Sequence, residues 1–274
     1  MKYLFILFLL ISTNAYNQNL SNLQFGTDST LDIMTWNIEF FPKAGQSTID
    51  SVSKIIQALE MDVIAVQEIE DTNAFRTMML GIPGYDGFAR LNYYIGMGFI
   101  YKTSSIQINA LYEIFTTQQY WNYFPRAPII MDMNYMNERY ILIVNHLKCC
   151  GDGFIESGNT DVEEYRRLQA ILLLKDYVDT YFPSEKTIIL GDLNDLITDQ
   201  PNTNVFLRLI EQVDEMNPEI GFGRYRILNE NSGLVTEAPF WTSAKEKNLN
   251  IVALNPGIWR IIFLKELLDG MFFK

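Results

Sequence analysis

The chain has 274 residues, of which 48% are hydrophobic and 14% aromatic, enough apolar material for one large domain or two small ones. Its formal net charge of −12 makes it a poor non-specific binder of nucleic acid or of an anionic membrane. The charge argues against a protein that packages or scans nucleic acid. It does not exclude a metal-dependent nuclease, because a bound metal ion supplies positive charge locally.

The first residues have the pattern of a secretory signal peptide. A single lysine precedes an apolar run over residues 3–11, and Ala15 ends a plausible small-residue cleavage site. The run is short for a membrane span, so a retained anchor is the second interpretation. We expect a signal peptide at residues 1–15, a polar linker at 16–30, and a secreted or periplasmic protein with no stable membrane partner.

Short apolar runs between turn signals predict buried strands, and apolar residues at helical spacing predict amphipathic helices. The predicted strands are Leu31–Trp36, Asp62–Gln67, Phe99–Lys102, Ile106–Ile114, Ile129–Met133, Tyr140–Asn145 and Thr187–Leu190. The predicted helices are Thr48–Glu60, Ala74–Leu80 and Glu163–Tyr181.

Details of three segments can be predicted as well. Ser47 is a plausible N-cap for the first helix, and a break is expected at residues 40–42, which end in a proline. The apolar face of the last helix is expected to consist of Leu168, Ile171, Leu172, Lys175 and Val178.

Polar residues follow several predicted strands at their carboxyl ends. Asn37, Glu68 and His146 each follow one strand, while Asp192 and Asn194 come after the glycine that ends another. Each of these residues alone is more often an ordinary strand end or an Asx turn. Together, as residue types that bind metal or phosphate, they indicate one site at one edge of stacked sheets.

Hydrolysis of a phosphodiester needs a cation at the phosphoryl oxygens, a base that activates water and an acid for the leaving oxygen. Glu68 is a good ligand for a hard cation, and Arg126 can donate two hydrogen bonds to phosphate. Each residue also has a purely structural interpretation. Glu68 could cap a helix, Arg126 could form a surface ion pair, and His146 could be a hydrogen-bonded core residue. For Glu39 and Asp195 the functional and structural interpretations are evenly balanced.

The motifs around these residues resemble those of the endonuclease/exonuclease/phosphatase superfamily, the deoxyribonuclease-like fold. The order and spacing both fit, and the resemblance covers about residues 31–200. Any one motif is weak, but the set is specific. The motifs are Thr35-Trp36-Asn37-Ile38, Ile64-Ala65-Val66-Gln67-Glu68, Arg126-Ala127-Pro128, Val144-Asn145-His146-Leu147 and Leu190-Gly191-Asp192-Leu193-Asn194.

The resemblance implies an α/β fold, a four-layer α/β/β/α sandwich, and phosphoester cleavage with Mg²⁺, or Mn²⁺, as cofactor. By the same resemblance Glu68 would be the metal ligand, and Asn37 would help to position metal or phosphate. No repeat or linker divides the matching part, so we assign residues 31–210 to one domain.

The resemblance also implies catalytic roles. Arg126 would contact phosphate, and His146 would assist at the phosphate or the leaving group. Asp192 and Asn194 would orient the nucleophile and the scissile phosphate.

The last part of the chain departs from the family. The family normally has an Asp-His pair on a late strand and a Ser-Asp-His on the last one, where the final histidine is the expected general base. Here nothing after Asn194 matches, and His146 is the only histidine. We interpret residues 211–274 as a divergent segment, a truncated or frame-shifted replacement that leaves the fold incomplete at the C-terminus. Missing strands would leave sheet edges uncovered.

These observations predict an exported, Mg²⁺-dependent phosphodiesterase. An endonuclease is the first interpretation, with nucleic acid or another phosphodiester as substrate and with activity reduced by the missing histidine. A phosphatase or phospholipid phosphodiesterase of the same superfamily is the alternative within enzymes. A non-catalytic relative that binds metal or phosphate is the alternative outside them.

The two cysteines of the chain, Cys149 and Cys150, are adjacent. In an exported protein they can form a vicinal disulfide. Two free thiols and ligands of a soft metal are the other interpretations, although a zinc site would need further ligands. We interpret the pair as structural or redox-sensitive, not as catalytic.

Overall fold

The computed structural model describes residues 24–92, 95–195, 200–207, 225–228, 251–254 and 259–264. The predicted signal peptide and the first part of the predicted linker lie outside the described residues. The described end of the linker is attached to the domain, because Phe25 and Gly26 both donate backbone hydrogen bonds to the Leu59 carbonyl. No described helix is long and apolar enough to cross a membrane.

The described elements alternate between helix and strand in the first part of the chain and are mainly strands in the middle. In order they are β1 (Leu31–Phe41), α1 (Gln46–Leu59), β2 (Val63–Ile69), α2 (Thr72–Leu80), β3 (Tyr85–Asn92), β4 (Ile95–Lys102), β5 (Ile106–Glu113), the 3-10 helix η2 (Gln118–Tyr120), β6 (Ile129–Tyr135), β7 (Glu138–His146), α3 (Glu163–Tyr181), β8 (Lys186–Asp192), β9 (Tyr225–Leu228), β10 (Ile251–Leu254) and β11 (Trp259–Leu264).

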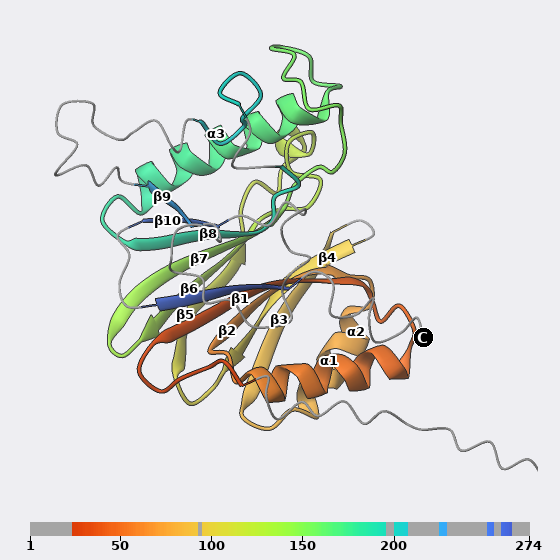
Figure 1. The fold of residues 1–274 in the computed structure, drawn as a ribbon, viewed down its shortest axis with the longest axis vertical. Helices are drawn as coiled ribbons and strands as arrows, with labels where there is room; N and C mark the ends of the chain where they lie inside the picture. The colour runs from red at the N-terminus through yellow and green to blue at the C-terminus, as the bar shows by residue number, and fades with distance from the viewer. Residues whose placement is uncertain are drawn as a thin grey trace, which may run out of the picture.

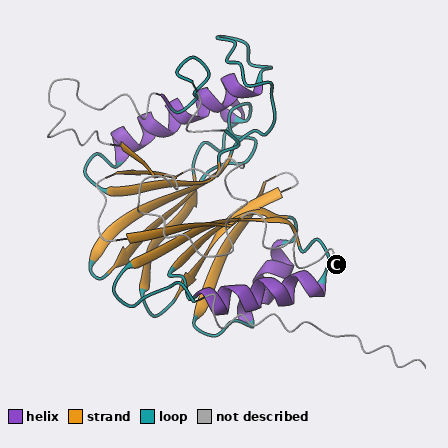
Figure 2. Ribbon diagram, in the orientation of Figure 1, coloured by secondary structure: helices purple, strands orange, loops and turns teal. Residues whose placement is uncertain are grey.

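Two sheets pack face to face and helices cover their outer faces (Figures 1 and 2). The first sheet has the order β11-β1-β2-β4-β3, and the second has the order β5-β6-β7-β8-β10-β9. In Figure 1 α3 lies over the second sheet, and α1 and α2 lie beneath the first. The four-layer α/β/β/α sandwich predicted from the sequence is confirmed.

Alternation along β1 explains how the layers are held together. Leu31 and Ile33 belong to the core between the two sheets, whereas Met34 and Trp36 belong to the core under α1 and α2. All four side chains are fully buried. Because successive side chains of a strand point to opposite faces, β1 supplies apolar side chains to both cores and is buried on both faces.

The end of β1 differs from the prediction. We expected a break at residues 40–42, but the strand continues to Phe41. Glu39 and Phe40 have φ values of 43° and 51°, so this end of the strand is irregular. Phe41 is nevertheless fully buried and packs edge-to-face against Phe75. Burial of this ring is the physical reason why the chain stays on the sheet.

Both helix details predicted for α1 and α3 need correction. The residue before α1 is Gly45, not Ser47, and no side chain caps this end. On α3 the buried residues are Glu164, Arg167, Ala170, Ile171, Leu174 and Val178. Ile171 and Val178 are therefore confirmed as part of the buried face, whereas Leu168, Leu172 and Lys175 are only partly buried, and the prediction was wrong for these three. A charged pair on the buried face disguises the apolar pattern that sequence reasoning looks for.

Strands also form in the segment for which we expected none. β11 pairs in parallel with β1, from Leu31 opposite Trp259 to Trp36 opposite Leu264. β10 pairs antiparallel with β8, and β9 pairs with β10. The expectation of missing strands is therefore wrong for these segments. The remaining residues of the divergent segment lie outside the described residues, and the frame-shift hypothesis stays a prediction.

The start of α2 provides a simple test of the local structure. Asp71 caps this helix, since its Oδ1 accepts from the backbone nitrogens of Asn73 at 2.8 Å and Ala74 at 2.9 Å. We expect Asp71→Ala to lower the free energy of unfolding by about 1 kcal/mol, measured by urea denaturation, because two amide groups lose their acceptor. Asp71→Asn keeps an acceptor and should cost much less. Equal losses in both variants would contradict this role for the side chain.

Candidate functional site

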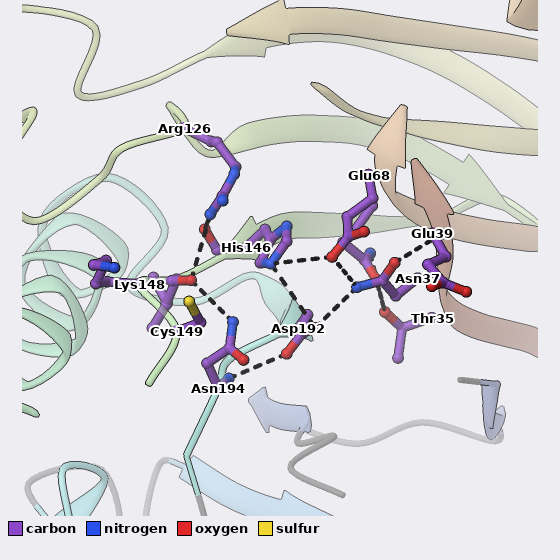
Figure 3. A network of polar contacts seen from close by, with 12 residues as sticks. Thr35, Asn37, Glu39, Glu68, Arg126, His146, Lys148, Cys149, Asp192 and Asn194 are labelled. Carbon is purple, nitrogen blue, oxygen red and sulfur yellow. Dashed lines mark hydrogen bonds and ion pairs between the residues drawn. The ribbon is translucent and has the colours of Figure 1, made fainter. Parts of the chain in front are cut away.

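The candidate site lies where two pairs of parallel strands end. β1 pairs in parallel with β2 in the first sheet, and β7 pairs in parallel with β8 in the second. In the second pair His146 lies directly opposite Asp192. Because parallel strands end at the same edge, each sheet brings its polar strand-end residues together, and the sandwich then places the two edges against each other (Figure 3).

Strand alternation directs three of these side chains into the space between the sheets. Asn37 continues the inward series of Leu31 and Ile33, and His146 continues that of Leu142 and Val144. Asp192 likewise follows the inward series of β8. An ideal strand would turn the next residue of each strand away from the site.

Glu68 reaches the same space by a different route. The register of β2 shifts between Gln67 and Ile69 against β4, and Glu68 between them has φ 63°. Gln67 points inward, as its contact with Thr35 across the two strands shows. The bulge lets the next side chain point inward as well. Left-handed backbone at a non-glycine residue costs energy and is found preferentially at functional sites.

Glu68, His146 and Asp192 form the one group of potential metal ligands found among the described residues. Their ligand atoms all lie within 4.8 Å of one another. His146 Nε2 is 3.9 Å from Glu68 Oε1 and 3.8 Å from Asp192 Oδ2. Burial is nearly complete for His146 and Asp192, at 5% and 2% side-chain exposure, and strong for Glu68, at 15%.

Asn37 connects the two carboxylates of this group. Its Nδ2 donates to Glu68 Oε1 at 2.7 Å and to Asp192 Oδ2 at 3.1 Å, while its Oδ1 accepts from the backbone nitrogen of Glu39. The amide nitrogen therefore faces the carboxylates and the amide oxygen faces the backbone. In this arrangement Asn37 orients both carboxylates, and its own oxygen does not face them.

Arg126 and Asn194 donate hydrogen bonds to the backbone at the end of β7. Arg126 Nη1 donates to the carbonyl of His146 at 3.0 Å, and Asn194 Nδ2 donates to the carbonyl of Leu147 at 3.0 Å. Burial lowers the pKa of Arg126, and attraction to Glu68 and Asp192 opposes that shift. An arginine stays charged under either influence, so a positive charge stands beside the carboxylates.

The close approach of β7 and β8 depends on Gly191. This glycine has φ 134°, and a Cβ atom added to it would lie 1.9 Å from the carbonyl oxygen of Asn145. Only a residue without a side chain allows this contact. The glycine of the Leu190-Gly191-Asp192 motif therefore lets His146 and Asp192 lie side by side.

The two residues with evenly balanced interpretations, Glu39 and Asp195, both form ion pairs in the structure. Glu39 forms an ion pair with Lys43 at the surface end of β1. Asp195 is buried and pairs with Arg167 at 2.7 Å between Oδ2 and Nε. Neither carboxylate belongs to the potential ligand group, and Asp195 has a structural contact instead.

A buried arginine beside the site was missed by sequence reasoning. Arg167 of α3 is 3% exposed and pairs with both Asp195 and Glu164. Its Nη1 also donates to the carbonyls of Lys148 and Cys150. One side chain thus ties the loop after β7 to the loop after β8. The available signal was the three-residue spacing of Glu164 and Arg167 within an apolar helix face.

The geometry fits a hard divalent cation. Two carboxylates converge, and Glu68 Oε2 is buried with no hydrogen-bond partner, although buried polar atoms normally have one. Carboxylate oxygens are the ligands that Mg²⁺ and Mn²⁺ prefer. A cation between Glu68 and Asp192, with Arg126 nearby, would create positive charge suited to a phosphate group.

Comparison with protein families gives one match. The model described as the Endonuclease/Exonuclease/phosphatase family matches residues 34–209. This range includes Asn37, Glu68, Arg126, His146 and the loop after β8. No curated protein matches the chain.

Comparison with solved structures gives the same fold at low sequence identity. An endonuclease/exonuclease/phosphatase from Bacteroides vulgatus matches with a TM-score of 0.58 and 15% identity, covering 84% of this chain and 88% of that one. A mannosyl-6-phosphatase from Bacteroides thetaiotaomicron matches with a TM-score of 0.55 and 12% identity, covering 81% and 85%. D. rerio TDP2 complexed with a single-strand DNA product matches with 0.51 and 13%, covering 81% and 82%.

Proposed function

The chain belongs to the endonuclease/exonuclease/phosphatase family, and we propose that it is a Mg²⁺-dependent phosphodiesterase that cleaves nucleic acid. The observation that carries the proposal is the convergence of Glu68, His146 and Asp192 from both sheets, with a buried carboxylate oxygen left without a partner. A solved relative of this fold holds a DNA product and another is named a phosphatase, so the choice of a diester is our inference.

Each side chain has a role that follows from its place. Glu68 and Asp192 would hold the cation, which supplies positive charge at the phosphoryl oxygens when bound. Asn37 fixes both carboxylates by donating to each of them. Arg126 contributes permanent positive charge toward the phosphate.

His146 is the residue best suited to move a proton. Its Nε2 faces the two carboxylates, at 3.9 Å and 3.8 Å, and the side chain is buried. From this position the imidazole can donate to a phosphoryl or leaving oxygen. Asn194, with its backbone nitrogen donating to Asp192 Oδ1 at 3.2 Å, fixes the other side of the Asp192 carboxylate.

The missing second histidine limits the expected rate. A positioned general base typically contributes a factor of ~10²–10⁴. Since His146 is the only histidine of the chain, the family's final histidine has no counterpart here. We therefore propose a slow enzyme in which water activation depends on the carboxylate and metal groups alone.

Removal of the metal tests the proposed function. The purified protein is incubated with supercoiled plasmid and with bis-p-nitrophenyl phosphate, in Mg²⁺ or in EDTA, beside the monoester p-nitrophenyl phosphate. We expect nicking and diester cleavage in Mg²⁺ and none in EDTA, because the carboxylates then face the phosphate without a cation between them.

The same experiment separates the alternatives. Preferential cleavage of the monoester would favour a phosphatase. A folded protein without turnover on any of the three substrates would contradict the enzyme and favour a non-catalytic relative.

We further propose that the protein is exported, on the sequence pattern of residues 1–15 alone. Fractionation of the producing cell would test this. A protein that stays inside the cell at full length would contradict it.

A further inference from the structure

We propose that Cys149 and Cys150 form a thiol–disulfide site at the edge of the phosphoester site, which takes small-molecule disulfides as its oxidant. The site lies on the loop between β7 and α3, just beyond His146. It is separate from the proposed hydrolysis, because neither sulfur belongs to the group formed by Glu68, His146 and Asp192.

The two sulfurs already touch. Both cysteines are free thiols, and their Sγ atoms are 2.8 Å apart. A disulfide bond is about 2.05 Å long, so less than about 1 Å of approach separates the thiols from bonding distance. Cys150 is exposed and Cys149 is partly exposed, so a small oxidant can reach the pair.

The backbone explains why neighbouring side chains converge here. In an extended segment successive side chains point to opposite sides. Cys150 has φ 74°, and this left-handed conformation turns its side chain toward that of Cys149. Such a conformation is costly for a residue with a side chain and persists only when the surroundings impose it.

The surroundings that impose it are the buried charges of α3. Arg167 Nη1 donates to the carbonyls of Lys148 at 2.9 Å and Cys150 at 2.8 Å, so it holds the chain on both sides of Cys149. The next residue, Gly151, passes so close to Glu164 that an added Cβ would lie 2.1 Å from Oε1. Contacts with α3 thus fix the conformation of the turn, and this conformation keeps the two sulfur atoms close to each other.

The pair is next to the residues proposed to handle phosphate. Figure 3 shows Cys149 on the same segment as His146 and Lys148, between Arg126 and Asn194. Arg126 and Asn194 hold the carbonyls of His146 and Leu147 on this segment. Oxidation of the thiols therefore takes place in a loop that is held by side chains proposed to act at the phosphate.

One molecule of a small disulfide is sufficient to oxidise both thiols. One of the two thiolates attacks a small-molecule disulfide and forms a mixed disulfide, releasing one thiolate. The neighbouring sulfur then attacks the protein sulfur of that mixed disulfide and releases the second thiolate. Two protein thiols are oxidised, the small disulfide is reduced to two thiols, and the protons of the cysteines go to these products. The resulting ring is small and strained, so a thiol reductant should reopen it.

Glutathione disulfide tests the proposal on the full-length protein. The reduced protein is incubated with it, and free thiols and intact mass are measured without using enzymatic activity. We expect the wild type to lose both thiols and the mass of two hydrogen atoms, with no bound glutathione, and to recover both thiols in dithiothreitol. Peptide mapping should place the bond between Cys149 and Cys150.

Two matched variants give the control. Cys149→Ser and Cys150→Ser each leave one thiol that cannot close a ring, so they should retain the glutathione adduct. A wild type that also retains adducts, or that keeps both thiols under the same conditions, would overturn the proposal.

A second probe avoids redox chemistry. Phenylarsine oxide condenses with two neighbouring thiols and releases water. It should bind the wild type one to one and neither serine variant. Failure of the wild type to bind would show that the sulfurs do not converge, and would overturn the proposal even if one variant did not fold.

Discussion

Glu68→Gln is expected to abolish Mg²⁺-dependent hydrolysis while leaving the protein folded. Glutamine keeps an oxygen that can accept from Asn37 Nδ2, which donates to Glu68 Oε1 at 2.7 Å. It removes the charge of the carboxylate whose second oxygen is buried without a partner. A metal ion supplies several kcal/mol of charge stabilisation in the transition state, so we expect a loss of roughly 1,000-fold in rate.

A measurement that does not depend on turnover should accompany this variant. A ligand that binds only the folded state raises the melting temperature. Millimolar Mg²⁺ should therefore stabilise the wild type and not Glu68→Gln. Glu70→Gln is the matched control, because Glu70 is exposed and lies only two residues further along the chain. If Glu68→Gln kept both the rate and the stabilisation, the metal site would have to lie elsewhere.

Arg167→Ala is expected to produce the largest loss of stability. It leaves the carboxylates of Glu164 and Asp195, 2% and 7% exposed, without their shared cation. The carbonyls of Lys148 and Cys150 lose their donor at the same time. Breaking a buried ion pair by removing one partner typically costs about 3–5 kcal/mol. Since domains are stable by only about 5–15 kcal/mol, urea denaturation should show a large shift.

An arginine on the surface provides the comparison. Arg76 is exposed on α2, and Arg76→Ala should change the free energy of unfolding by no more than about 0.5 kcal/mol. Similar values for Arg76→Ala and Arg167→Ala would mean that the buried charges are satisfied by water, and the proposed role of Arg167 would be wrong.

Much of the fold could be predicted from the sequence because several strands are apolar on both faces. β7 and β8, for example, have few polar interruptions before their last residues, so their position and their ends were readable. The face of α3 was not readable. Periodicity treats an arginine and a glutamate as exposed, but Arg167 and Glu164 neutralise each other in the interior.

The candidate site also has features that could be predicted from the sequence and features that could not. Strand order and alternation bring Asn37, His146 and Asp192 together, and the sequence was sufficient to predict that they meet. The side chain of Glu68 points inward because of a bulge, at which Glu68 has φ 63°. The residue pattern of β2 does not predict this bulge. Likewise the sequence does not reveal that Asp195 points to Arg167, because this contact joins a loop to a helix that precedes it in the chain.

The pairing of β1 with β11 has a consequence for folding during translation. Leu31 lies opposite Trp259, so β1 is made long before β11, the strand that pairs with its edge. At translation rates of ~5–20 residues per second, β11 is made on the order of ten seconds or more after β1. Until then the edge of β1 that pairs with β11 has no partner strand. During this time β1 offers unpaired backbone groups to any other nascent chain. Synthesis at high ribosome density should therefore favour aggregation of this protein, and a chaperone that shields the nascent strand should counteract it.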